Sequence, residues 1–223
     1  MTESATAHQL KDACEQLLSD AQNPDDVTVR RITELARTNI GAVNYHFGSL
    51  ERLIFSVGER VYLRLNAERL TLLAQAVARN HPQPADAASL IAALVGPSIR
   101  WSLDPKSSYR VLKHMTTIAQ ASHHPEIFNP IVEDVEHHRT FIPHFRLVAP
   151  WLSDVDIGFR ISCILGVRSQ IIRNRHRTEM LTDHAIDLGS AEIVLQQVVA
   201  ATAPMFTAPP QPYPNGVSIP SRH

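Results

Sequence analysis

The chain has 223 residues, of which 21 are basic and 22 acidic, so its formal net charge is −1. Its apolar fraction of 44% and charged fraction of 19% are those of a globular protein, which excludes a disordered or fibrous chain. Only 8 glycines occur, and neither G-x-G-x-x-G nor G-x-x-x-x-G-K is present, which favours helices and argues against a nucleotide-dependent enzyme.

The cysteines and the N-terminus indicate the compartment. Cys14 and Cys163 lie far apart, so the sequence predicts neither a disulfide framework nor a C-x-x-C pair. Met1 to Glu15 contain acidic residues and no apolar core, unlike a signal peptide, and no apolar stretch is long enough to span a membrane. We therefore expect a cytoplasmic protein with no membrane partner.

The sequence pattern of residues 1–48 predicts three short helices. In the first, apolar residues recur at helical spacing: Leu10, Ala13, Cys14, Leu17 and Leu18. A loop over residues 20–26 follows, and Thr28 is expected to cap a second helix whose buried residues are Val29, Ile32, Leu35 and Ala36. Asn39 is expected to cap a third helix that turns inward Ile40, Val43 and Phe47.

The rest of the chain also predicts helices. Gly48 and Ser49 close the third helix and cap a fourth, which runs through Leu53 to Leu65. Helical patterns then cover residues 85–103, 107–122, 125–145, 154–175 and 182–203. Residues 204–223 contain six of the fifteen prolines and are predicted to be a disordered tail. No segment predicts a strand, so the expected fold class is all-α.

The charge is unevenly distributed along the chain. Residues 1–27 carry a net charge of −5 and residues 28–69 a net charge of +3. A basic segment in a neutral chain is consistent with a polyanionic partner. An ordinary solvated helix surface would give the same count.

The second and third predicted helices have the organisation of a helix-turn-helix, which places its second helix in the DNA major groove. The expected outer face of the third helix comprises Gly41, Ala42, Asn44, Tyr45 and His46. Small residues permit close approach to bases, Asn44 could pair with adenine, and Tyr45 and His46 could donate to phosphates. Alternatively, Tyr45 and His46 are half-buried packing residues of an ordinary helical domain.

Two runs, Thr28 to Ala36 and Asn39 to Leu53, resemble the DNA-binding domain of TetR-family transcriptional regulators, most strongly from Gly41 to Ser49. The resemblance implies a homodimer that represses transcription, releases double-stranded DNA when a small molecule binds, and is neither an enzyme nor dependent on a cofactor. It implies that the DNA-binding residues are Thr28, Thr38, Asn39, Gly41, Ala42, Asn44, Tyr45, His46 and Arg52.

The sequence departs from the family's pattern at three places. Arg37 stands where the family usually has a turn glycine, and Leu50 replaces a lysine that commonly contacts phosphate, although Arg52 could partly substitute. The usual Gly-aromatic pair before Thr28 is replaced by an acidic loop over residues 23–26. These departures bear on the affinity for DNA more than on the fold.

The expected domains are a helix-turn-helix domain over residues 1–55, a helical effector-binding and dimerisation domain over 56–203, and the tail over 204–223. The apolar helices in residues 154–203 are expected to form the dimer interface. The predicted effector contacts are Trp101, Leu103, Arg110, Val111, His114, Met115, Ile118, Phe141, Phe145 and Arg168. The same residues would fill any helical core.

Two other interpretations remain open. Six of the twelve histidines lie within residues 114–144, and Glu133–His137 and Asp134–His138 have the i, i+4 spacing of metal ligands, as in a His-rich metal-binding protein or metalloenzyme. Solvated histidines are the simpler explanation, so we assign no metal site. The third interpretation is an all-α interaction module whose helix-turn-helix has lost DNA binding.

Overall fold

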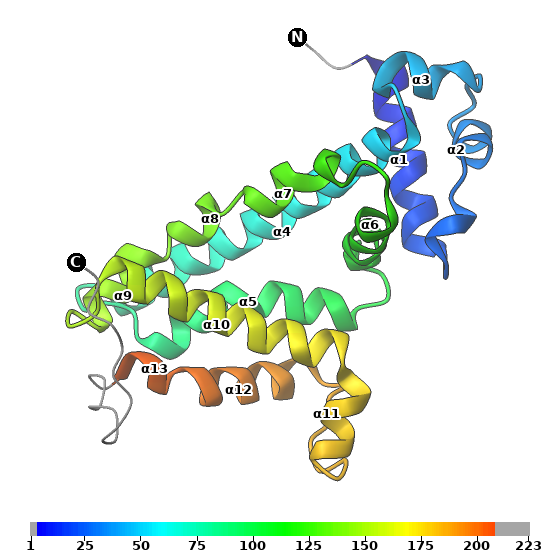
Figure 1. Ribbon diagram of the computed structural model, residues 1–223. Helices are drawn as coiled ribbons and strands as arrows, with labels where there is room; N and C mark the ends of the chain where they lie inside the picture. The colour runs from blue at the N-terminus through cyan, green and yellow to red at the C-terminus, as the bar shows by residue number, and fades with distance from the viewer. Residues whose placement is uncertain (1–3, 208–223) are drawn as a thin grey trace.

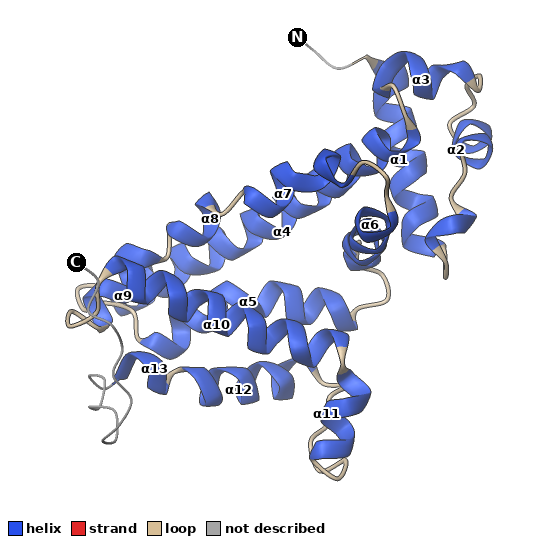
Figure 2. Cartoon of the chain, viewed as in Figure 1, coloured by secondary structure: helices blue, strands red, loops and turns tan. Residues whose placement is uncertain are grey.

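The computed structural model describes residues 4–207, which form helices and loops without a strand in that range (Figures 1 and 2). The all-α prediction is confirmed. The N-terminal helices are α1 (Ala5–Asp20), the 3-10 helix η1 (Pro24–Asp26), α2 (Val29–Leu35) and α3 (Gly41–Phe47). The remaining helices are α4 (Leu50–Asn80), α5 (Ala87–Leu103), α6 (Tyr109–Ala121), the 3-10 helix η2 (Pro125–Phe128), α7 (Asn129–Glu133), α8 (Glu136–Arg139), α9 (Ile142–Val148), α10 (Asp154–Arg173), α11 (Arg175–Leu181), α12 (Ala191–Thr202) and α13 (Pro204–Thr207).

Side-chain caps start α2 and α4 where the sequence predicts them. The Thr28 hydroxyl accepts a hydrogen bond from the backbone N–H of Arg31 (3.4 Å), and Ser49 accepts one from that of Arg52 (3.2 Å). The prediction that Asn39 caps α3 is wrong. Ile40 occupies the N-cap position, and it is the backbone carbonyl of Asn39 that accepts from Ala42 (3.0 Å).

Two apolar cores lie along α4, which passes without a break through residue 55 (Figure 1). The first core joins α1, α2, α3 and the start of α4 to residues of α6, η2 and α7, among them Val111, Met115, Phe128 and Ile131. The second joins the end of α4 to α5, α9, α10 and α12. Because α6 completes the first core, the domain division at residue 55 remains a prediction.

The C-terminal half differs from the sequence prediction in three segments. Residues 125–145 do not form one helix, because the chain turns at Asp134 and starts again in α8 and α9. Residues 182–190 form a turn in which Asp183 and His184 have positive φ angles, and the last long helix begins at Ala191. Residues 204–207 form α13, whose Phe206 stacks on Phe145 (4.2 Å between ring centroids), so the disordered tail is wrong there. Residues 208–223 lie outside the described range.

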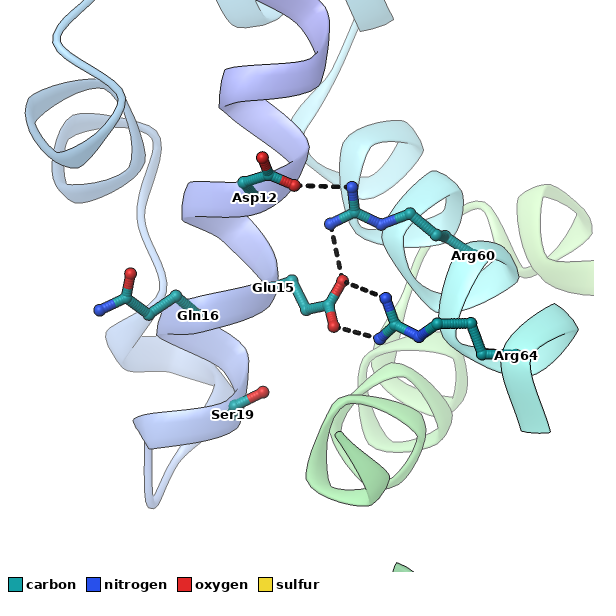
Figure 3. A pocket seen from close by; sticks show the side chains of 6 residues that line it. All are labelled: Asp12, Glu15, Gln16, Ser19, Arg60 and Arg64. Carbon is teal, nitrogen blue, oxygen red and sulfur yellow. Dashed lines mark hydrogen bonds and ion pairs between the residues drawn. The ribbon is translucent and has the colours of Figure 1, made fainter. Parts of the chain in front are cut away.

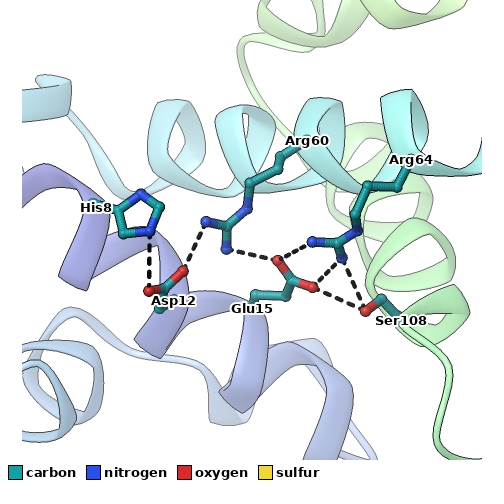
Figure 4. A network of polar contacts seen from close by, with 6 residues as sticks. All are labelled: His8, Asp12, Glu15, Arg60, Arg64 and Ser108. Carbon is teal, nitrogen blue, oxygen red and sulfur yellow. Dashed lines mark hydrogen bonds and ion pairs between the residues drawn. The ribbon is translucent and has the colours of Figure 1, made fainter. Parts of the chain in front are cut away.

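A group of ion pairs joins α1 to α4, around a polar hollow of about 310 Å³ (Figure 3). Arg60 donates to Asp12 (2.7 Å) and Glu15 (2.6 Å), and Arg64 pairs with Glu15. The Ser108 hydroxyl, just before α6, donates to Glu15 (2.9 Å) (Figure 4). Burial opposes ionisation of Glu15, but the hydrogen bonds from Arg64, Ser108 and Arg60 outweigh it and lower its pKa. We call these five residues the α1–α4 clamp.

None of the helices within residues 4–207 has the length and apolar character needed to cross a bilayer.

Candidate nucleic-acid interface

The helices α2 and α3 form a helix-turn-helix whose inner residues pack on α1 (Figure 1). Ile32 of α2 and Val43 of α3 are fully buried. On the outer face of α3, Gly41 and Asn44 are exposed and the Tyr45 side chain is 85% exposed. Tyr45 is therefore not a packing residue. Its outward orientation agrees with the sequence prediction.

The turn between α2 and α3 adopts its shape without a glycine. Arg37 has a φ of 54°, in the left-handed region, and the backbone N–H of Thr38 donates to the carbonyl of Thr33 (3.0 Å). A side chain in this region costs roughly 1–2 kcal/mol. Arginine in place of glycine at position 37 thus makes the turn less stable but still allows the chain to turn between α2 and α3.

The end of α3 presents two polar rings beside each other. The Tyr45 and His46 rings are nearly perpendicular, with centroids 4.9 Å apart, and His46 is half-buried. Gly48, with a φ of 80°, ends the helix in a conformation that a side chain would strain. The nitrogen of Lys11 lies 5.9 Å from the centre of the Phe47 ring, which adds a positive charge from α1.

Three predicted orientations are wrong. Ala42 was expected on the outer face but is only 6% exposed, whereas Ile40 and Leu35 were expected inside and are 63% and 42% exposed. Because α3 begins at Gly41, Ile40 precedes the helix, and Ala42 and Val43 together face α1. The side chain of Ala42 consequently cannot reach a thymine methyl group.

The other predicted contact residues lie around α3. Thr28, Asn39 and Arg52 are exposed, and Thr38 is half-buried. Leu50 is half-buried against the first core, so nothing at this position replaces the family's lysine.

The basic surface is smaller than the charge of residues 28–69 suggests. Arg60 and Arg64 belong to the α1–α4 clamp, and Arg69 is buried. Arg30 pairs with Glu34 (2.8 Å). Among residues 28–69, the exposed arginines that have no carboxylate within 4.0 Å in the described part of the chain are Arg31, Arg37 and Arg52.

Comparisons with known proteins point to one fold. No protein-family model matches the chain, and neither does any curated protein. Solved structures do match the chain, and three of them illustrate the similarity. They are the multidrug binding protein EbrR in complex with imidazole (14% identity, 88% of this chain and 96% of that chain, TM-score 0.52), the fatty acid degradation regulator FadR from Bacillus halodurans (15%, 89% and 97%, 0.59), and a protein assigned as a transcriptional regulator from Pseudomonas aeruginosa PAO1 (16%, 90% and 93%, 0.55).

The chain has a TetR-like fold. Identities of 14–16% establish the fold alone, and they confirm at that level the resemblance carried by Gly41 to Ser49. The similarity covers the helices beyond residue 55 as well, where the sequence motif gives no information.

Within this TetR-like fold, the predicted effector contacts are not gathered in one place. Val111 and Met115 belong to the first core, against which Trp101 and Ile118 pack, whereas Phe141 and Phe145 belong to the second, with Leu103 packed against it. Two predicted polar anchors hold the end of α1: Arg110 donates to the carbonyl of Asp20 (3.5 Å), and the His114 Nε2 lies 3.0 Å from that of Ala21. Arg168 is half-buried on α10.

The histidines of the TetR-like fold do not support the alternative of a metal site. Glu133 ends α7 and His137 lies in α8, so they do not share the face of one helix. Within residues 4–207 there is no group of three or more His, Cys, Asp or Glu side chains that could hold a metal ion. The spacing argument for a metal-binding protein therefore fails.

Proposed function

We propose that the protein is a ligand-responsive DNA-binding transcriptional regulator, and not an enzyme. On this proposal it represses transcription as a homodimer bound to a pseudo-palindromic operator, and a small effector releases it. The observation that carries the proposal is the outer face of α3, where Gly41, Asn44 and Tyr45 project to solvent from a helix of a width that a major groove admits.

The residues of α3 take different roles in this proposal. Asn44 reads a base edge, since an amide can bond an adenine through two hydrogen bonds, and Gly41 allows the backbone to approach. The Tyr45 hydroxyl and the His46 ring bind phosphates, and so do Thr28, Thr38, Asn39 and Arg52 around the helix. Phosphate contacts orient the protein, whereas Asn44 selects the sequence.

The exposed apolar residues of α10 support a dimer. Val155 and Phe159 are 74% and 71% exposed and lie one helical turn apart. The apolar residues Val194 and Val198 of α12 are instead buried in the second core. We therefore propose that α10 contributes most of the apolar contact area within the interface over residues 154–203.

Selection of bound fragments from random DNA tests the proposal directly. We expect a two-fold symmetric consensus with half-sites about one helical turn apart. Tyr45→Phe should weaken binding by a similar factor on every sequence, whereas Asn44→Ala should reduce the preference for one base pair. Asn129→Ala, an exposed asparagine on α7, is the matched control.

Two results would contradict the proposal. If no fragment is enriched, the chain is an interaction module with a helix-turn-helix that does not bind DNA. If Tyr45→Phe and Asn44→Ala change the consensus in the same way, the assignment of phosphate and base contacts is wrong.

A further inference from the structure

A second group of polar side chains lies inside the larger helical unit, between the two apolar cores. Tyr62, Asn66 and Arg69 occupy one face of α4, at i, i+4 and i+7. The first core uses α4 up to Tyr62, whose ring packs against it, and the second uses α4 from Leu70 onward. The polar residues thus occupy a place where the packing of α4 would otherwise be apolar.

The α8 helix lies beside α4 (Figure 1) and brings two histidines to this group. The Tyr62 hydroxyl is 3.1 Å from His137 Nε2, which in turn is 3.2 Å from His138 Nε2. Burial lowers the pKa of His137 to about 4 and that of His138 to about 3, so both rings are neutral at pH 7. They contribute no charge to the group.

The charge of the group comes from two arginines. Arg69 is 2% exposed and donates through Nε to the carbonyl of Leu94 (3.0 Å) and through an Nη to Asn66. Arg168 of α10 lies close enough to Tyr109, at the start of α6, to interact with it electrostatically. Burial, and then the charge of Arg168, lowers the pKa of Arg69 to about 10.

The two guanidinium charges are not neutralised by the protein. Within residues 4–207, no carboxylate lies within 4.0 Å of either guanidinium. Glu68 contributes at longer range and accepts a hydrogen bond from the indole N–H of Trp101 (2.8 Å). A buried charge without a partner is strongly unfavourable, which applies above all to the almost fully buried Arg69, so the group carries a cost that a bound anion would remove.

Unsatisfied donors point to the same conclusion. Asn66 is 4% exposed, and its Nδ2 is buried without a hydrogen-bond partner among the described residues, as is Nε of Arg168. Buried polar groups of proteins are nearly always hydrogen-bonded. Both atoms can only donate, so the missing partner is an acceptor.

A cavity adjoins the group. It has a volume of about 430 Å³ and lies between α8, α9 and α10, where apolar residues line it together with His138, Arg139, Asp154 and Ser162. Its lining residues Ile161 and Leu165 and the nearby Arg168 share one face of α10, at i, i+4 and i+7. His138 therefore belongs both to the cavity and to the polar group.

We propose that the effector is an organic acid, whose carboxylate binds between Arg69 and Arg168 and whose apolar part occupies the cavity lined by Ile161 and Leu165. This inference rests on the proposed function, and it names the chemical class of the molecule that releases the DNA. Asn66 donates to the same carboxylate. Planar, two-pronged guanidinium groups suit carboxylates better than any other protein cation does.

Thermal unfolding with defined probes tests the proposal without DNA. The probes are octanoate, decanoate, benzoate and phenylacetate, each paired with its uncharged primary amide. We expect at least one acid to raise the Tm of the wild-type protein while its amide does not. Arg69→Met should weaken the binding of that acid by about 10- to 100-fold, the loss expected for hydrogen bonds to a charged group.

The variants also give a readout that does not need the ligand. Arg69→Met removes a buried, unneutralised charge, so we expect it to raise the Tm of the ligand-free protein by about 2–4 °C. Arg64→Met is the matched control on the same helix: it breaks an ion pair of the clamp, should lower the Tm, and should leave the response to the acid unchanged. Arg168→Met is the second variant and should also abolish the response.

The outcomes separate this inference from the proposed function. The inference is overturned if no acid raises the Tm, if acid and amide act equally, or if Arg69→Met and Arg168→Met respond as the wild type does. The regulator proposal would survive such a result if a DNA consensus is found. Conversely, if the acid binds but the protein shows no affinity for DNA, the carboxylate site is supported and the proposed function as a regulator is refuted. If both hold, the acid should lower operator affinity in the wild type but not in Arg69→Met.

Discussion

Acidification should destabilise this protein through His137, well above the pH at which carboxylates titrate. The ring is buried between Tyr62 and His138, and it also faces Asp134, with Arg69 and Arg168 nearby. Burial, followed by the charge of Arg69, lowers its pKa from 6.5 to about 4. The folded state thus holds the neutral ring, whereas the unfolded chain takes up a proton as the pH falls below 6.5.

The sign and size of this change in stability follow from the linkage between proton binding and folding. Stability falls with decreasing pH wherever the unfolded chain binds more protons, so the contribution of His137 is complete above pH 6.5 and disappears as the pH falls toward 4. Between pH 7 and pH 5 the loss from this residue alone is about 2 kcal/mol. Urea unfolding followed by far-UV circular dichroism at both pH values measures it.

His137→Gln isolates the contribution, because it keeps a polar side chain but removes the titration. The difference in unfolding free energy between pH 7 and pH 5 should shrink by about 2 kcal/mol in this variant. His123→Gln, an exposed histidine in the loop after α6, serves as the control and should show the wild-type difference. An equal pH dependence in His137→Gln and the wild type would refute the reasoning.

Three further substitutions test the turn, the packing of α6 and the clamp. Arg37→Gly should raise the unfolding free energy by about 0.5–1 kcal/mol, since glycine adopts the left-handed φ without strain, and the Tm should rise accordingly. Gly58→Ala should lower it by about 1–3 kcal/mol, since the new methyl group would overlap the side chain of Met115, and the loss in the double variant with Met115→Ala should be smaller than the sum of the two single losses. Glu15→Gln should lower it by about 2 kcal/mol at pH 7. Because the pKa of Glu15 is lowered, this last difference from the wild type should narrow below pH 4.5. Urea unfolding at fixed pH measures all three.

Each of these predictions has a result that contradicts it. An unchanged or lower Tm for Arg37→Gly would mean that the turn relaxes in the wild type. Wild-type stability of Gly58→Ala would mean that α6 moves freely against α4. Equal stability of Glu15→Gln and the wild type at pH 7 would mean that the clamp behaves as an ordinary surface ion pair.

The sequence predicts the N-terminal helices well because local signals define them. The hydroxyl caps Thr28 and Ser49 and the glycine at position 48 fix three helix ends within a few residues. Periodicity fails at Ile40 and Ala42, because a start of α3 one residue later rotates which residues face α1. Over seven residues, the hydrophobic pattern is too short to resolve such a shift.

The polar groups inside the larger unit could not be predicted in the same way. A charged residue in a helix pattern is ordinarily assigned to the surface, so Arg69 was counted with the basic segment. Arg60 and Arg64 were counted there as well, because their partners Asp12 and Glu15 lie more than forty residues earlier. Pairing over such separations depends on the tertiary fold. The sequence does not indicate that Asn66 and Arg69 are buried, and their burial in the structure is what suggests an anion-binding site.

The length of α4 has a mechanical consequence. Its 31 residues make a rod of about 46 Å, with the helix-turn-helix at one end and the polar group near the middle. A pivot of about 5° at the far end would sweep the other end through about 4 Å. If the protein acts as the proposed DNA-binding dimer, two subunits swinging in opposite directions would then no longer match grooves about 34 Å apart. On the proposed function, a pivot of a few degrees at the far end of this rod would therefore decide whether both α3 helices can engage DNA at once.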